Sequence, residues 1–168
     1  AQFYRFSDIG KPKAQALSSM LKDFADVNVT FHTEAVDEDT VPNMSGIVLM
    51  AVDSMQVRSE MYHAIKKRGY NIKYIIDPRM SAEMYAQYTI NPHDNKDQTM
   101  YERTLYSDKE AVQERCTAKS TVYTATLAAG YIAKTVKQLI TNSQYTRCLQ
   151  WDIRNNKNQM IEGVSQWH

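Results

Sequence analysis

Cysteine is scarce in this sequence, which holds only Cys116 and Cys148 in 168 residues. Two cysteines that form no CxxC pair can neither build a disulfide framework nor supply a structural zinc site, and this usage fits a reducing compartment. The histidines show no metal-ligand spacing either; they are His32, His63, His93 and His168. We therefore expect a cytoplasmic protein that binds no zinc.

An excess of charge of one sign is also absent, because 20 Lys and Arg residues balance 19 Asp and Glu residues to a net charge of +1. Such a balance creates no long-range field for nucleic acid or for an anionic membrane. The longest uncharged run, Ser120–Ala133, is shorter than the ~20 apolar residues of a membrane-spanning helix. The 11 tyrosines could stack on bases, but without a basic stripe beside them packing is the stronger interpretation. We expect neither nucleic acid nor a membrane as a partner.

The composition that is present, 43% hydrophobic and 23% charged residues, is typical of a folded globular chain. Helical spacing of apolar residues predicts a helix over Lys11–Ala25, with Pro12 in its first turn. Alternating Val and Phe side chains predict a strand over Val27–Phe31, and the acidic segment Glu34–Asp39 predicts a surface loop. The unbroken apolar run Gly46–Val52 is typical of a strand buried on both faces, so we expect it to be the central strand.

The rest of the chain continues this alternation. Asp53 and Ser54, both good N-cap residues, open a predicted helix that stops before Gly69. The next predicted elements are strands over Asn71–Ile76 and Glu83–Ile90, a long polar loop over Asn91–Thr104 and a strand or hairpin from Tyr145. A helix is predicted over Ser120–Ile140, and its mostly small apolar stripe should lie close on the sheet; the stripe consists of Val122, Ala125, Ala129, Ile132, Val136 and Ile140. This order predicts an α/β fold, with a mainly parallel sheet and flanking helices.

Two places in this fold could bind a phosphate or a metal ion. Lys11 and Lys13 lie at a predicted helix start, where free N–H groups and a lysine charge attract phosphate, although a solvated lysine pair is the plainer interpretation. Asp53 lies where a strand ends and a helix begins, so its carboxylate could hold Mg²⁺ or orient a nucleotide. It could equally be a plain N-cap. On the residues alone both alternatives stay open.

A succession of short motifs carries a resemblance to a known family. The motifs are Gln2-Phe-Tyr-Arg5, Asp8-Ile-Gly-Lys-Pro-Lys13, Ile47-Val-Leu-Met-Ala-Val-Asp53 with Arg58, Ile76-Asp-Pro-Arg79, and Cys116 before the long helix. In this order and spacing the chain resembles the ThiF/MoeB/HesA family, relatives of ubiquitin-activating enzymes. The resemblance implies an incomplete Rossmann-like ThiF fold. It also implies that residues 1–168 form a single ThiF-like domain, the C-terminal part of the family fold.

The resemblance implies an activity and its residues. Family members use ATP and Mg²⁺ to adenylate the C-terminal carboxylate of a ubiquitin-like or sulfur-carrier protein, and they are commonly homodimers. Lys13 matches the lysine that contacts the ATP phosphates, and Asp53 matches the aspartate that binds magnesium. Arg58 matches an arginine on the following helix, which would serve the cofactor site or pair with strand-end carboxylates. Cys116 matches a cysteine that takes part in acyl or sulfur transfer in some members; the alternative is an ordinary small half-buried residue.

The chain departs from the family in its glycines. It has 5, none in a G-x-G-x-x-G arrangement, so it lacks the backbone cradle that phosphate binding in this fold uses. Arg5 could replace the family arginine that contacts phosphate, although it lies beyond the expected position, and Ser54 stands where the family usually has Asn. We expect the C-terminal part of a ThiF-like adenylyltransferase that is inactive until a Gly-rich unit is supplied. The alternative is a degenerate, non-catalytic binding or dimerisation module.

Overall fold

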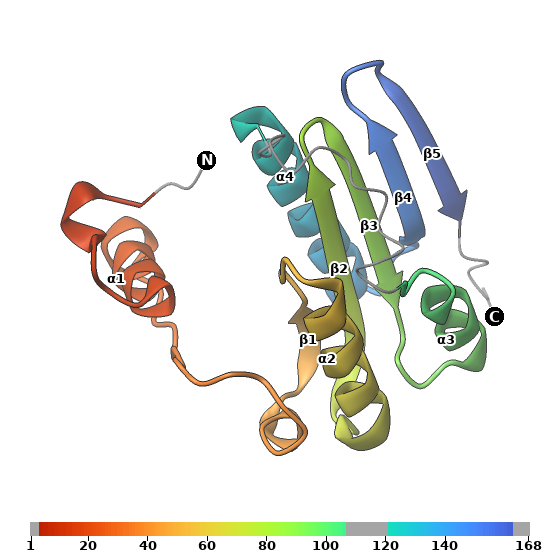
Figure 1. Cartoon of the computed structure of the whole chain (residues 1–168), viewed down its shortest axis with the longest axis horizontal. Helices are drawn as coiled ribbons and strands as arrows, with labels where there is room; N and C mark the ends of the chain where they lie inside the picture. The colour runs from red at the N-terminus through yellow and green to blue at the C-terminus, as the bar shows by residue number, and fades with distance from the viewer. Residues whose placement is uncertain (1–3, 107–120, 163–168) are drawn as a thin grey trace. The chain divides into compact units, whose positions relative to one another are not determined.

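A computed structural model describes residues 4–106 and 121–162 of the chain (Figure 1). The chain divides into two compact units, residues 1–36 and residues 37–168, and each is described by itself. The prediction of one ThiF-like domain over residues 1–168 stays a prediction. Cys116 lies outside the described residues.

The first unit contains a short 3-10 helix, η1 (Phe6–Asp8), and one α-helix, α1 (Lys13–Ala25). α1 confirms the predicted helix and ends at Asp26, whose φ of 52° is left-handed. The predicted strand over Val27–Phe31 is wrong, because this exposed segment belongs to neither a strand nor a helix. Alternation yields a strand only where a neighbouring strand takes up the backbone hydrogen bonds. Here the carbonyl of Val29 accepts a hydrogen bond from the Ser18 hydroxyl instead, at 2.8 Å.

The second unit is built on a five-stranded sheet whose strands lie in chain order. The strands are β1 (Gly46–Leu49), β2 (Ile72–Ser81), β3 (Met84–Ile90), β4 (Thr146–Asp152) and β5 (Lys157–Glu162). β1 and β2 are parallel, whereas the three following pairs are antiparallel. The α/β class is therefore confirmed, and the prediction of a mainly parallel sheet is wrong. Only Ala82 and Glu83 join β2 to β3, and such a short loop can join only antiparallel strands.

β1 lies at an edge of this sheet, so the prediction that its apolar run forms the central strand is wrong. Leu49 at its end is 47% exposed, whereas Ile75 and Ile76 of β2 are fully buried. β2 also continues through Pro78, beyond the predicted end of the strand. Pro78 is tolerated because β1 already ends opposite Ile76, so no second neighbouring strand needs the missing N–H.

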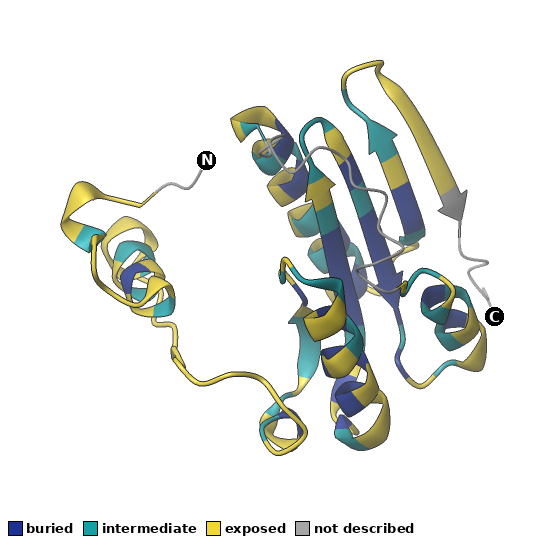
Figure 2. Ribbon diagram, in the orientation of Figure 1, coloured by how far each residue is buried: buried dark blue, intermediate teal, exposed yellow. Residues whose placement is uncertain are grey.

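Three helices flank the sheet: α2 (Met55–Arg68), α3 (Asn95–Glu102) and α4 (Val122–Ile140). On one face, Tyr62 of α2 and Tyr101 of α3 pack in a core with Tyr88 of β3. On the other face, Ala128 of α4 packs with Tyr85 of β3. The odd spacing of the two β3 tyrosines places them on opposite faces of the sheet. Figure 2 shows the buried residues concentrated along β2 and β3, between these helices.

α3 lies inside the segment Asn91–Thr104, for which the sequence predicts a long loop, and that prediction is wrong. Asp94 caps the helix, because its Oδ1 accepts hydrogen bonds from the backbone N–H groups of Lys96 and Asp97, both at 2.9 Å. Tyr101 is fully buried and anchors the helix to the core. A helix of 8 residues shows too little periodicity to stand out in a sequence, and packing supplies most of its stability.

The predicted helices at α2 and α4 are confirmed, but α4 presents another face to the sheet than predicted. The buried residues of α4 are Thr124, Ala128, Thr135 and Leu139. Gln87 of β3 is buried and donates a hydrogen bond from Nε2 to Thr135 Oγ1 at 2.8 Å, so a polar strand residue selects the threonine face. The predicted apolar stripe is left partly exposed, with Val122 at 45% and Ile140 at 68%.

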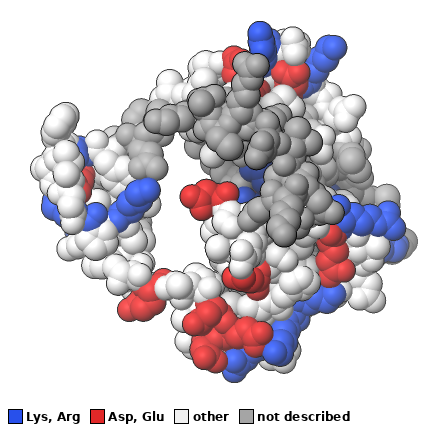
Figure 3. All heavy atoms as spheres, in the orientation of Figure 1, with Lys and Arg blue, Asp and Glu red and all other residues white. Residues whose placement is uncertain are grey.

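The balanced charge of the chain shows on the surface as interleaved ion pairs. Around α2 and the 3-10 helix η2 (Val41–Asn43), Lys67 pairs with Glu38 and Arg68 with Asp39 (Figure 3). β4 and β5 form the predicted C-terminal hairpin. Within the described ranges, no helix combines the length and the apolar character that crossing a membrane requires.

Candidate functional site

Asp53 lies in the short loop between β1 and α2, one residue before the N-cap Ser54, and it is exposed. The N-cap of α2 is Ser54, whose Oγ accepts a hydrogen bond from the Val57 N–H at 3.3 Å. Among the described residues, none is a hydrogen-bond or ion-pair partner of the Asp53 carboxylate. The plain capping role is therefore filled by the neighbouring serine, and the aspartate is left available for a ligand.

Arg58, one turn into α2, holds the loop between β1 and Asp53. Its side chain is buried, and its Nη1 donates hydrogen bonds to the carbonyl of Met50 at 3.3 Å and to Oδ1 of Asp77. Its Nη2 donates to the carbonyl of Val52 at 2.6 Å. The expected pairing of Arg58 with a strand carboxylate is therefore present. From inside the protein, the guanidinium also holds the loop that precedes Asp53 through its two carbonyls. A direct role of Arg58 in cofactor binding stays a prediction.

Asp77, in the middle of β2, is the hub of this buried cluster and has no exposed surface. Besides Arg58, it accepts hydrogen bonds on Oδ2 from Arg79 Nε at 2.9 Å and from the Tyr101 hydroxyl at 2.8 Å. A buried carboxylate is retained only where charged and polar donors compensate its lost hydration. Sequence reasoning assigned Asp77 no role; the signal was a carboxylate directly after the apolar pair Ile75-Ile76, within the motif Ile76-Asp-Pro-Arg79.

Arg79 connects the cluster to the end of α3. Its two terminal nitrogens donate hydrogen bonds to the carbonyl and to Oγ1 of Thr104, both at 2.9 Å. The guanidinium stacks on the ring of Tyr88, 4.4 Å from the centroid. Burial is the largest single influence and lowers the pKa of Arg79, but the Asp77 carboxylate together with the rings of Tyr101 and Tyr88 raises that pKa above its usual value. Arg79 therefore stays charged and fixed in place.

The predicted phosphate-binding residues Lys13 and Arg5 belong to the first unit. Lys13 is the first residue of α1 and is exposed. Arg5 pairs with Asp23 at 3.0 Å, and Lys11 pairs with Asp8 at 3.2 Å. Of the lysine pair at the helix start, Lys13 is therefore the one without an ion-pair partner in the described part of the chain.

Comparison with known proteins identifies the family. The ThiF family model matches residues 1–166 of this chain. The chain belongs to the ThiF family. The crystal structure of selenomethionine-labelled PaaA is similar, with a TM-score of 0.60 and 13% sequence identity over 95% of this chain and 57% of the PaaA chain. That likeness shows the fold alone, and this chain spans little more than half of PaaA. No curated protein matches the sequence.

The side chains that could ligate a metal limit which ions this ThiF chain could hold. Among the described residues, no three His, Cys, Asp or Glu side chains are grouped as metal ligands. A single free carboxylate such as that of Asp53 suits Mg²⁺, which commonly takes one or two carboxylates and completes its shell with water and substrate phosphates. Asp53 therefore fits a magnesium ion that arrives with a nucleotide, and it does not fit a metal held by the protein alone.

The second cysteine of the ThiF chain, Cys148, lies in β4 and is buried. Burial raises the pKa of its thiol, and the nearby charge of Arg79 only partly offsets this. A protonated, inaccessible thiol is a poor nucleophile. Cys148 is therefore a packing residue, and any acyl or sulfur transfer would depend on Cys116.

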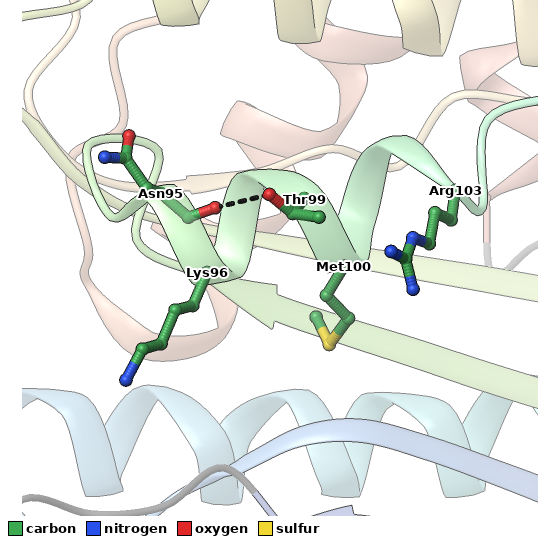
Figure 4. A pocket seen from close by; sticks show the side chains of 5 residues that line it. All are labelled: Asn95, Lys96, Thr99, Met100 and Arg103. Atoms are coloured by element: carbon green, nitrogen blue, oxygen red, sulfur yellow. Dashed lines mark hydrogen bonds between the residues drawn. The ribbon is translucent and has the colours of Figure 1, made fainter.

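α3 also borders an open hollow that no sequence motif pointed to. The hollow measures about 490 Å³ and is lined by Asn95, Lys96, Thr99, Met100 and Arg103. Figure 4 shows these side chains along the helix, with Lys96 and Arg103 two turns apart and Met100 between them. The hollow is therefore an open, basic surface. Its lining residues lie far from the Asp53 loop in the sequence.

Proposed function

We propose that this ThiF-family chain takes part in the ATP- and Mg²⁺-dependent adenylation of the C-terminal carboxylate of a ubiquitin-like or sulfur-carrier protein. One observation carries the proposal: Asp53 lies at the carboxyl end of β1 with its carboxylate exposed, while Ser54 caps the helix. In open α/β sheets this is where ligands bind. Family membership supplies the class of reaction.

In this proposal each residue of the chain has a limited task. The Asp53 carboxylate would hold the Mg²⁺ that accompanies a nucleotide. The family resemblance assigns the ammonium of Lys13, a point charge, to an ATP phosphate. When bound, Mg²⁺ neutralises the charge that develops on the phosphates during adenylate formation. Arg58 keeps the Asp53 loop in one conformation through the carbonyls of Met50 and Val52. Arg5, in place of the usual family arginine, would add a second phosphate contact, although doing so requires leaving Asp23.

The proposal also includes a role for Cys116 and a cellular location. The Cys116 thiolate would attack the carbonyl carbon of the acyl adenylate and form a thioester as AMP leaves, without zinc at the site. A part in sulfur transfer is the alternative role of this cysteine. A cytoplasmic location is proposed on the cysteine usage alone.

ATP–pyrophosphate exchange in the complete gene product tests this function. With a sulfur-carrier or ubiquitin-like protein present, we expect exchange that depends on Mg²⁺ and on the free C-terminal carboxylate of that protein. A carrier protein whose C-terminus is amidated is the matched control and should support none. Binding of the carrier protein with no exchange at any Mg²⁺ concentration would instead identify the non-catalytic module.

Calorimetric titration of the 168-residue chain with ATP and Mg²⁺ should show no binding tighter than about millimolar. The chain has Lys13 and Asp53 but no G-x-G-x-x-G, and in this fold backbone N–H groups of that loop supply much of the phosphate affinity. Micromolar affinity would mean that other residues form the phosphate cradle.

We also propose that a second copy of the chain is a partner. The edge strand β1 and the ends of α4 offer apolar surface, including Leu49, Val122 and Ile140. Natural proteins seldom leave a strand edge and apolar residues together in water. Sedimentation equilibrium should show self-association in the micromolar range, and Ile140→Glu should weaken it. A monomer throughout that range contradicts the proposal.

A further inference from the structure

One buried carboxylate connects two loops of the second unit. Through Arg58, Asp77 is joined to the carbonyls of Met50 and Val52, which precede Asp53. Through Arg79, it is joined to the backbone and hydroxyl of Thr104, just after α3. Both loops are therefore held by one aspartate that has no exposed surface.

The contacts leave Arg58 little freedom while Asp77 is charged. The Arg58 side chain is 5% exposed, and its Nη1 and Nη2 both donate to partners in the protein. An arginine held by a carboxylate in this way has a fixed orientation, because the planar guanidinium offers its donors in a rigid fork. Without that charge, Arg58 would be a buried cation whose best alternative is to turn toward water. It would then release the two carbonyls of the loop.

We propose that Asp77 is a positioning residue for Asp53: acting through Arg58, it fixes the loop that presents the Asp53 carboxylate, and through Arg79 it couples that loop to the end of α3. This inference rests on the proposed function for its consequence, since Asp53 is there the ligand of Mg²⁺. Residues that orient a metal ligand from behind affect metal affinity by about 10–100-fold. Asp77 itself is buried and touches neither the ion nor a nucleotide.

The matched control for Asp77 is Glu102, which resembles it in chemistry but lies outside the network. Glu102 accepts hydrogen bonds from the Tyr62 hydroxyl at 3.0 Å and from Lys66 at 2.7 Å, so it too joins a tyrosine and a cation. Asp77→Asn and Glu102→Gln each remove one negative charge and keep the side-chain shape. If the loss of any carboxylate that contacts α2 disturbed the packing of that helix, both variants would show the effect.

Two measurements on the complete gene product test the proposal. By ¹⁵N relaxation, the backbone order parameters of residues 51–53 should be about 0.85 in the original protein and Glu102→Gln, and fall below about 0.6 in Asp77→Asn. In ATP–pyrophosphate exchange, Asp77→Asn should raise the Mg²⁺ concentration for half-maximal rate about 10-fold. A merely structural role would lower the amplitude through loss of folded protein and leave that midpoint unchanged.

The outcomes separate the two proposals. Unchanged order parameters in Asp77→Asn overturn the positioning role whatever the activity. If the original protein shows no exchange, the proposed function fails, and the order parameters alone decide the positioning role. If Asp77→Asn does not fold, Arg58→Lys replaces it: lysine keeps the charge beside Asp77 but cannot reach both carbonyls. Ordered residues 51–53 in folded Arg58→Lys would then contradict the proposal.

Discussion

Replacing Asp53 by Asn should lower adenylate formation by at least about 10²–10³-fold, since a group that stabilises transition-state charge contributes on that scale. The substitution removes the exposed Asp53 carboxylate just beyond β1 and keeps the size of the side chain. Stability should change little, because Ser54, and not Asp53, caps α2. ATP–pyrophosphate exchange measures the first effect and thermal unfolding the second.

The control for this prediction is the neighbouring residue. Ser54→Ala removes the side-chain acceptor of the Val57 N–H and should cost about 1 kcal/mol of stability, while the specific activity of the folded protein is retained. The reversed pattern, a stability loss in Asp53→Asn with full activity, would show that the aspartate is structural.

Asp77→Ala should lower the free energy of unfolding by about 3–5 kcal/mol, the usual cost of removing one partner of a buried ion pair. The substitution leaves the buried Arg58 and the partly buried Arg79 without their common carboxylate and the Tyr101 hydroxyl without its acceptor. That loss is a large part of the 5–15 kcal/mol by which domains are stable. Urea unfolding followed by circular dichroism measures it.

Glu102→Gln should shift stability by no more than about 1 kcal/mol in the same experiment, because its ion pair with Lys66 is 38–39% exposed and screened by water. If both variants lost the same free energy of unfolding, the buried contacts of Asp77 would stabilise the protein no more than the exposed ion pair of Glu102. Double substitution of Arg58 and Asp77 by apolar residues should restore part of the loss, since no unpaired charge then remains between them.

Local patterns in the sequence were enough for α1, α2, α4 and the family, whereas the short helix α3 was missed. The repeat of apolar residues predicted α1 and α4, and the pair Asp53-Ser54 followed by Gly69 predicted both ends of α2. The order of short motifs indicated the ThiF family, which the family model confirms over residues 1–166. Helix periodicity, caps and motif spacing involve residues close together in the chain, so a sequence carries them directly.

Strand direction, strand position and the partners of Asp77 were decided only by the tertiary structure. The apolar run of β1 looked doubly buried but lies at the edge, because which strands flank it depends on residues far along the chain. The same holds for α4, whose threonine face meets the sheet because Gln87 of β3 needs the Thr135 hydroxyl. Asp77 gathers Arg58 and Tyr101 from positions 19 residues before and 24 residues after it. Such contacts depend on the free energy of packing the whole unit. A buried charge is stable only where hydrogen-bond donors from several elements surround it.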